Sequence, residues 1–229
     1  MKQIRNTNGL PVAIVLLATI AVAVSFLKHQ IKTEVPIPIP ELPGKVWIGQ
    51  KAPPIVLKDE QNQDVNLSKV MGKKPVVLLF YSGISDIYSQ GQIIMSLPYE
   101  QQFAAQGATI YLIAMGSVKV ERDAFYSVLA MRKLKRPGNV FQFVSDPMGA
   151  AASNYAGLIT ATNSEEKTRL RRATFAIGKN NIIKYAYITV SKKTLDDINT
   201  LMTSVKEISA ELKQVDPKET SRKAETKSI

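Results

Sequence analysis

The chain has 229 residues, of which 45% are apolar, a net charge of +11 and no cysteine. This length and composition predict one domain with a substantial core and shorter segments attached to it. The lack of cysteine excludes disulfides, thiolate metal sites and thiol catalysis. The single histidine, His29, lies beside an apolar segment, which excludes histidine-based catalytic and metal sites from the domain.

Residues 10–27 are uncharged and almost wholly apolar, with basic residues on both sides: Lys2, Arg5, Lys28 and Lys32. As a helix this stretch would be about 27 Å long, close to the hydrocarbon thickness of a bilayer. We therefore expect a single transmembrane helix that anchors the chain to the lipid bilayer. Residues 1–9 would form a short basic N-terminus before it.

The alternative for this segment is a cleaved signal peptide, which would leave a secreted domain. Ala21-Val22-Ala23 supplies small residues at a suitable spacing for cleavage. The apolar run continues as far as Leu27, however, and this length favours an uncleaved signal-anchor. The basic residues near the two ends favour a single-pass membrane protein with its domain on the exported, periplasmic or extracytoplasmic side.

Residues 28–45 contain prolines at positions 36, 38, 40 and 43. Closely spaced prolines fix φ and remove hydrogen-bond donors, so we expect an extended, polyproline-like spacer. A proline-rich ligand for another protein is the alternative. Residues 46–213 then form the folded domain, and residues 214–229, polar up to the last position, are expected to be a disordered tail.

The domain alternates apolar strand patterns with helical patterns. Strands are predicted at Ile55–Leu57, around Val65, and at Val76–Tyr81, Thr109–Met115, Phe141–Val144, Ala173–Ile177 and Ile182–Ile188. Helices are predicted within Ile87–Gln106, at Val120–Lys135, after Asp146 and at Thr194–Lys213. With a hairpin across Gly178–Asn181, this order predicts an α/β fold with a mixed sheet and helices on both faces.

The net charge of +11 favours anionic neighbours: acidic lipid, nucleic acid or acidic protein. Four basic residues fall at the end of the predicted helix Val120–Lys135, where they complement the helix dipole: Arg132, Lys133, Lys135 and Arg136. We interpret them as a solvated surface, with a specific binding patch as the alternative. Nucleic acid is not expected, because no aromatic residues are interleaved with the basic ones.

Several short motifs of the domain, taken in their order and spacing, resemble the peroxiredoxin (AhpC/TSA) family of the thioredoxin-like fold. The resemblance spans roughly Gly49 to Ile208. The motifs are Gly49–Pro53, Ile55–Leu57 with Val65–Ser68, the strand Val77–Tyr81, Ser145-Asp146 with Gly149, Ala152 and Tyr155, and Arg172–Ile177. The resemblance implies a thioredoxin-like, peroxiredoxin-type mixed sheet flanked by helices.

The same resemblance implies a dismantled active site. In active members the loop after the central strand carries a proline, then a threonine or serine, and then the peroxidatic cysteine on the first turn of a helix. In this sequence Ser82 takes the proline position, Asp86 the threonine position and Ser89 the cysteine position. Only Arg172 keeps the residue type of the family, so no catalytic residue is assigned with confidence.

The missing thiolate leads to a hypothesis about Asp86. In the family the thiolate lies at a helix N-terminus near the arginine matched by Arg172, and both stabilise an anion. Aspartate is a favoured N-cap, and Asp86 precedes Ser89 by three residues. We expect Asp86 to supply the negative charge, cap the helix and pair with Arg172, while Ser89 hydrogen-bonds nearby. An exposed, unpaired aspartate is the alternative.

We therefore expect a membrane-anchored pseudoenzyme that acts as a binding or assembly module with an unidentified protein partner. Enzyme activity stays open, with no thiol peroxidase activity expected. The alternatives are a redox or antioxidant protein working with a partner's cysteine, and a basic structural subunit at the membrane surface. No glycine-rich nucleotide motif is present, so no cofactor is expected, and the lack of cysteine and of a histidine in the domain means that no metal ion is expected.

Overall fold

The computed structural model describes residues 46–156, 158–159, 169–189 and 196–214. They lie within Glu41–Ile229, one of two compact units of the chain. The strands are β1 (Val56–Lys58), β2 (Asp64–Asn66), β3 (Val76–Phe80), β4 (Thr109–Ala114), β5 (Phe141–Ser145), β6 (Leu158–Ile159), β7 (Arg169–Leu170), β8 (Ala173–Ile177) and β9 (Ile183–Ile188). The α-helices are α2 (Ile87–Ser96), α3 (Glu100–Ala105), α4 (Val118–Met131), α5 (Ala150–Tyr155) and α6 (Ile198–Lys213).

Seven of the described strands form one mixed sheet in the order β2-β1-β5-β4-β3-β8-β9. The three strands β3, β4 and β5 run parallel, whereas β8 is antiparallel to β3, and β1 is antiparallel to β5. The strand β3 therefore has a partner on each edge. A strand in that position is covered on both faces, which explains why all of its residues are apolar and buried. This sheet fits the predicted thioredoxin-like fold.

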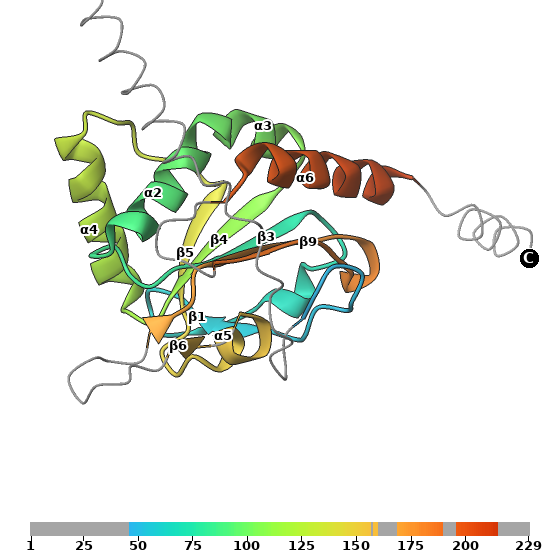
Figure 1. Ribbon diagram of the computed structural model, residues 1–229, viewed down its shortest axis with the longest axis horizontal. Coiled ribbons are helices and arrows are strands. Elements are labelled where there is room, and N and C mark those ends of the chain that lie inside the picture. The colour runs from blue at the N-terminus through green and yellow to red at the C-terminus, as the bar shows by residue number, and fades with distance from the viewer. Residues whose placement is uncertain (1–45, 157, 160–168, 190–195, 215–229) are drawn as a thin grey trace, which may run out of the picture. The chain divides into compact units, whose positions relative to one another are not determined.

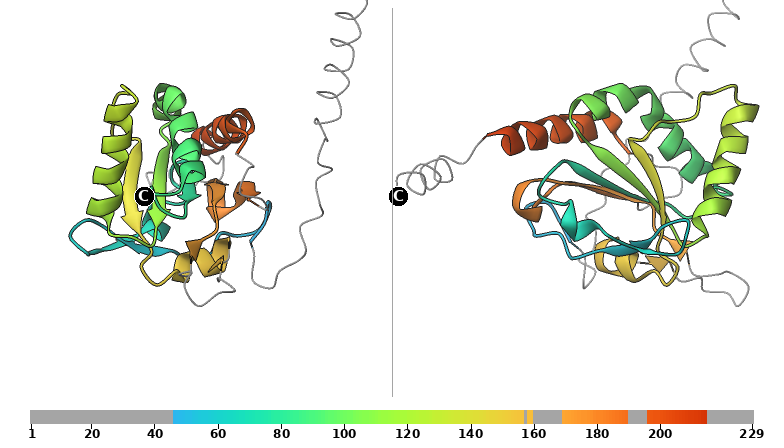
Figure 2. Two further views of the ribbon diagram at one scale, coloured as in Figure 1. Left: turned by 60° about the vertical axis from the view of Figure 1, so that its left-hand side comes forward. Right: turned by 180° about the vertical axis from the view of Figure 1, so that it is seen from behind.

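Alternate residues of β3 enter two separate cores, because successive side chains of a strand point to opposite faces of the sheet. Val76, Leu78 and Phe80 belong to one core. Val77 and Leu79 belong to the other, together with apolar residues of α2, α3, α4 and α6. Figures 1 and 2 show these four helices on one side of the sheet and α5 on the other. The prediction of helices on both faces is confirmed.

The core on the α5 side is centred on three aromatic rings, those of Phe80, Tyr155 and Phe175. The Phe80 and Phe175 centroids lie 6.1 Å apart and the Tyr155 and Phe175 centroids 5.4 Å apart, both pairs packed edge to face. The Tyr155 hydroxyl donates to the backbone carbonyl of Pro53 at 2.6 Å. Asp146, 4% exposed, accepts the backbone N–H of Ala152 and so fixes α5 against β5.

Three of the predicted helices have different bounds in the structure. The segment predicted as a helix within Ile87–Gln106 is divided into α2, a 3-10 turn at Leu97–Tyr99 and α3, because Pro98 cannot donate within a continuous helix. The helix predicted at Val120–Lys135 ends at Met131, so the basic residues that follow lie beyond its last turn. The helix predicted to begin at Thr194 begins at Ile198 instead, because Asp197 caps it.

The short pair β6–β7 has no counterpart among the predicted strands, since two residues per strand are too few for an alternating pattern. The predicted anchor at 10–27 and the spacer at 28–45 lie outside the described residues, as does the predicted tail at 214–229 apart from its first residue. Within the described part of the chain, no helix is both long enough and apolar enough to span a bilayer. The anchor and the domain boundaries therefore stay predictions.

Candidate functional site

The candidate site lies where β3 ends and α2 begins, at the carboxyl edge of the parallel strands. A short loop, Tyr81–Asp86, joins the two elements. Gly83 has φ of 116°, which favours glycine because a side chain rarely adopts such a backbone. The loop therefore turns sharply and brings the first turn of α2 over the end of the sheet.

Asp86 caps α2, as the sequence predicts. Its backbone is extended, and its side chain accepts from the backbone N–H groups of Tyr88 and Ser89. The Ser89 bond, to Asp86 Oδ2, is 3.0 Å long, and the Tyr88 bond, to Oδ1, is 3.4 Å. The carboxylate thus satisfies donors at the helix N-terminus and adds a negative charge where the helix dipole favours one.

Two serines complete the hydrogen bonding of the same carboxylate oxygen. Ser89 Oγ donates to Asp86 Oδ2 at 2.7 Å, and Ser82 Oγ donates to it at 2.9 Å. Ser89 Oγ also accepts the backbone N–H of Ser82 at 3.2 Å. Ser89 is completely buried, so the hydroxyl at the position matched to the peroxidatic cysteine is bonded to its neighbours and closed to solvent.

Arg172 reaches the site from β8. The antiparallel pairing of Phe80 with Ala173 places the residue before β8 beside the loop that follows β3. Arg172 is 6% exposed, with its Nε 3.9 Å from Asp86 Oδ2 and its guanidinium 5.4 Å from the ring centre of Tyr88. The four residues that the resemblance matches to the family's site, Ser82, Asp86, Ser89 and Arg172, are therefore brought together.

The electrostatics of Asp86 favour its ionised form. Burial raises the pKa of Asp86, but hydrogen bonds from Ser89, from Ser82 and from the backbone outweigh burial and place the pKa below its ordinary value of 3.8. The carboxylate is therefore charged at neutral pH. Its charge stands near the arginine and the helix N-terminus, where the resemblance implies a thiolate in active peroxiredoxins.

The sequence did not reveal the two side chains that hold the loop in place. Glu121 of α4 accepts the backbone N–H of Ile84 at 2.8 Å, and Gln90 donates to the carbonyl of the same residue at 2.8 Å. Glu121 also affects the buried Tyr81, whose pKa is raised first by burial and then by this carboxylate. No local pattern marks Glu121, because its role depends on the packing of α4 beside the loop.

A buried polar row continues from the site beneath α2. The residues that α2 buries are Ser89, Gln92, Ile93 and Ser96, so the inward stripe of the helix is mostly polar. Gln92 donates to Thr174 of β8 at 3.0 Å, and Tyr185 of β9 donates to Asp196, which precedes α6. The helical spacing of positions 89, 92 and 96 is the signal in the sequence that could have located this row.

Asp86 and Asp196 predict opposite pH dependences of stability. The pKa of Asp86 is lowered on folding. Its contribution to stability is therefore complete above the pKa of the unfolded state and is lost as pH falls through the pKa of the folded state. The pKa of Asp196 is raised by burial from 3.8. Its contribution to stability is therefore complete below the pKa of the unfolded state and is lost as pH rises through the pKa of the folded state.

We therefore expect Asp196→Asn, which resembles the protonated acid and still accepts from Tyr185, to become more stable relative to the native chain as pH rises from 4. Asp86→Asn should show its largest deficit near neutral pH and a smaller one in acid. Urea unfolding at a series of pH values measures both trends. If the free energy of unfolding changed with pH in the same way for the native chain and both variants, the directions given for the two pKa shifts would be contradicted.

The described residues offer no group of three acidic or histidine side chains that could hold a metal ion. The small cavity bordered by Gln92, Asp196 and Leu201 has a volume of about 10 Å³, which is space for one water molecule. It is too small for an organic cofactor. In the cluster itself, Ser89 and Arg172 are buried, whereas Ser82 and Asp86 are partly exposed.

Comparisons with known proteins agree with the fold. A model of the AhpC/TSA family matches residues 48–186. Among solved structures, a cysteine-to-serine mutant of peroxiredoxin 6 from Arenicola marina is similar with a TM-score of 0.59 and 14% identity, covering 70% of this chain and 72% of that one. Peroxidoxin BcpB from Mycobacterium tuberculosis is similar with a TM-score of 0.54 and 18% identity, covering 70% and 97%. A search of curated proteins finds no match.

Proposed function

The chain belongs to the AhpC/TSA family, and from this premise we propose that it is a membrane-anchored pseudoenzyme whose domain binds or assembles with another protein. The lack of thiol peroxidase chemistry is the part of this proposal that follows most directly from the sequence. The chain has a peroxiredoxin-like fold and contains no cysteine. The membrane anchor and the assembly role are the further steps of the proposal.

The observation that carries the proposal is the bonding of Ser89. Peroxide reduction in this family needs a thiolate that attacks the O–O bond and becomes a sulfenic acid. A serine hydroxyl stays protonated at neutral pH and has no comparable oxidation step. Here the hydroxyl donates to Asp86 at 2.7 Å and is completely buried. The bonding and burial of Ser89 therefore favour a structural role for this hydroxyl.

Burial also weighs against the alternative in which a partner supplies the missing cysteine. A thiol of a partner would have to approach Arg172 and the helix N-terminus, but Arg172 is only 6% exposed and Asp86 already occupies the N-terminus. The anchored module is supported instead by the apolar stretch 10–27 and the proline-containing segment that follows it. Such a tether would keep the domain near a bilayer.

The experiment that tests the proposal uses the full-length chain in its own membranes. After alkaline carbonate washing we expect the intact chain in the membrane pellet, because an uncharged span of this length does not leave the bilayer. After solubilisation in detergent and affinity capture we expect a protein partner in constant ratio to the chain. Recovery of a shortened chain in the supernatant, or of the chain alone after capture, would contradict the corresponding part of the proposal.

The same purified chain should consume no hydrogen peroxide with an added thiol reductant. A cysteine-containing peroxiredoxin serves as the positive control, and the buffer with reductant alone sets the background. Peroxide loss above that background, proportional to the amount of the chain, would overturn the pseudoenzyme assignment whatever the capture experiment shows.

A further inference from the structure

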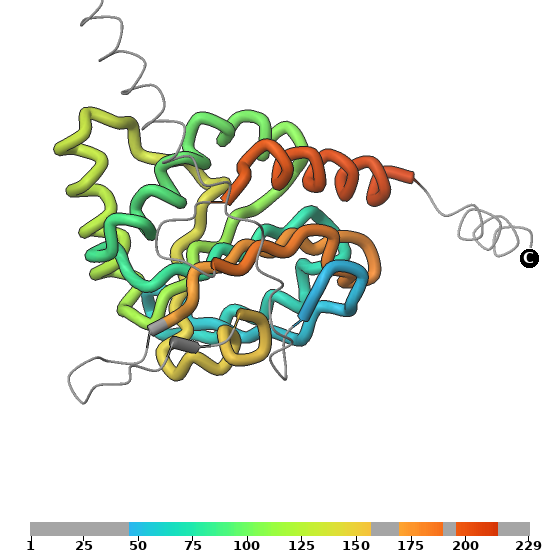
Figure 3. The backbone as a smooth tube through the Cα atoms, in the orientation of Figure 1, coloured from blue at the N-terminus to red at the C-terminus, as the bar shows by residue number. Residues whose placement is uncertain are grey.

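The surface that follows α4 combines unusual backbone geometry, charge and exposed apolar side chains. We name residues 131–136, Met-Arg-Lys-Leu-Lys-Arg, the basic corner. Figure 3 shows the chain leaving the end of α4 at a corner of the described domain and turning back toward β5. The helix ends there in a Schellman motif: Lys133 N–H donates to Ala130 at 3.1 Å, and Leu134 N–H donates to Leu129 at 2.9 Å.

Lys133 occupies the position of this motif that favours glycine. Its φ is 56°, in the left-handed region that costs a residue with a side chain more than it costs glycine. The lysine side chain is exposed and makes no ion pair among the described residues. A residue with a side chain at such a position is a reason to ask what its exposed charge contacts.

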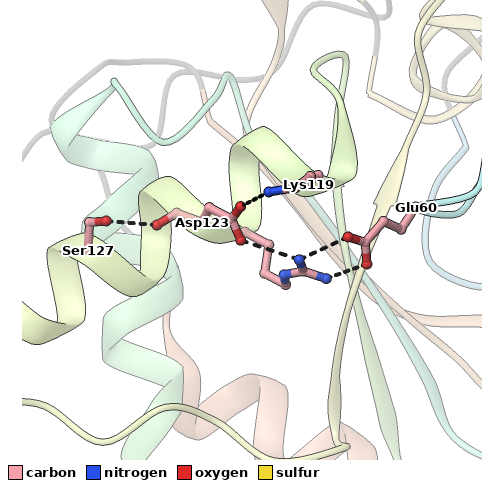
Figure 4. Close-up of polar contacts among 5 residues, drawn as sticks. Glu60, Lys119, Asp123 and Ser127 are labelled. Atoms are coloured by element: carbon pink, nitrogen blue, oxygen red, sulfur yellow. Dashed lines mark hydrogen bonds and ion pairs between the residues drawn. The ribbon is translucent and has the colours of Figure 1, made fainter.

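Some cations elsewhere on the described domain have acidic partners, among them two at the other end of α4. Lys119 and Arg122 both contact Asp123, and Arg122 also forms a two-point contact with Glu60; Figure 4 shows the contact of Lys119 with Asp123. The basic corner contains no acidic residue. In the described structure its members make no ion pair: Arg136 stacks 4.6 Å from the ring centre of Tyr126, and Arg132 makes only a 3.4 Å bond to Gln90.

The apolar side chains of the corner decide between possible anionic partners. Met131 is 77% exposed and Leu134 is 42% exposed, and both lie among the four cations. Nucleic acid would use the cations but would leave these apolar side chains without a partner, and Tyr126 is covered by Arg136 rather than free to stack on a base. A bilayer accommodates both parts, with anionic headgroups for the cations and the interfacial region for the apolar side chains.

We propose that the basic corner docks the domain on an anionic lipid surface, with Met131 and Leu134 inserted between the headgroups. The inference extends the membrane tethering of the proposed function, because a tethered domain meets the bilayer repeatedly. Docking through the basic corner does not itself require the anchor at 10–27. The docking surface consists of described residues alone, so its failure and the failure of the anchor are separable.

The absence of cysteine allows a direct test, because a single introduced cysteine can carry an environment-sensitive fluorophore. The full-length chain is labelled through Met131→Cys, or through Met148→Cys as the control, since Met148 is 82% exposed but lies in the connection that leads to α5. Each chain is reconstituted in nanodiscs of phosphatidylcholine, or of phosphatidylcholine and phosphatidylglycerol in equal parts. We expect a blue shift at position 131 in the anionic nanodiscs alone, reversed by salt, and none at 148.

Charge variants separate docking from stability. Lys133→Gly with Lys135→Gln should weaken docking about 30-fold, because each basic residue near an anionic surface contributes roughly fivefold. Lys133→Gly alone should melt no lower than the native chain, since glycine relieves the backbone. Lys58→Gln with Lys184→Gln is the matched control: both lysines are paired, with Asp64 and Glu211, and docking should not change.

An equal shift at both positions, a shift independent of phosphatidylglycerol, or unchanged docking in the corner variant would overturn the proposal. A response to a short DNA duplex in place of anionic lipid would also overturn it, in favour of nucleic acid. If the chain elutes apart from the nanodiscs, the anchor is wrong. The docking comparison is then made by adding vesicles of the same two compositions to the labelled chain.

Discussion

Replacing Asp86 with alanine should lower the free energy of unfolding by about 3 kcal/mol. Loss of a helix N-cap costs about 1–2 kcal/mol. The buried Ser89 hydroxyl would also lose its charged acceptor at 2.7 Å and keep only Ser82 Oγ, 3.0 Å away, and exchanging a hydrogen bond to a charged group for a neutral one costs about 1 kcal/mol more. Arg172 would lose a nearby negative charge as well. Urea unfolding followed by circular dichroism measures the change.

Asp197→Ala is the matched control for this variant. Asp197 is also an aspartate N-cap, and it accepts from Asn199 N–H and from the Thr200 hydroxyl at the start of α6. Its surroundings are exposed, so water can replace the lost acceptor, and we expect a clearly smaller destabilisation than for Asp86→Ala. Equal losses for the two variants would show that the serines and Arg172 add nothing to ordinary helix capping at Asp86.

Ser89→Cys alone should give a thiol that is poorly reactive and no peroxide turnover. The new sulfur would take the place of an oxygen that lies 2.7 Å from Asp86 Oδ2, in a completely buried position. A neighbouring negative charge and burial both raise the pKa of a thiol above its usual 8.5 or so. We therefore expect alkylation by iodoacetamide at pH 7 to be at least about tenfold slower than for an exposed cysteine.

The double variant Asp86→Thr with Ser89→Cys tests the cause. Threonine is the residue that the family resemblance implies at position 86, and it removes the carboxylate while keeping an N-cap. With Arg172 and the helix N-terminus then acting on the thiol alone, its pKa should fall below that of the single variant. Rates of alkylation across a pH series give both values. A low pKa already present in the single variant would show that Asp86 does not control this position.

The parts of the fold that the sequence predicts are those with local signals. The five consecutive apolar residues of β3 and the position of Asp86 three residues before Ser89 each lie within one short segment. The thioredoxin-like fold and the meeting of Asp86 with Arg172 came from the family resemblance, and the structure has this meeting because β8 pairs with β3. The role of that cluster in the cell stays a prediction.

The features that were not predicted depend on contacts between distant segments. Glu121 can accept from the loop after β3 only because α4 packs beside that loop. Gln92 can donate to Thr174 only because β8 lies beneath α2. The end of α4 was placed too late because Arg132, Lys133 and Lys135 favour helix by composition. The left-handed backbone of Lys133 closes the helix against that preference.

The pairing of β3 with both β4 and β8 has a consequence for synthesis of the chain. A ribosome completes β3 and β4 well before β8. One edge of β3, the most apolar strand, therefore has no partner until β8 is made. An unpaired apolar edge is a site where chains aggregate. Arg172 immediately precedes β8 in the chain. A chain that ends before this point therefore lacks both the strand that covers this edge of β3 and the arginine beside Asp86.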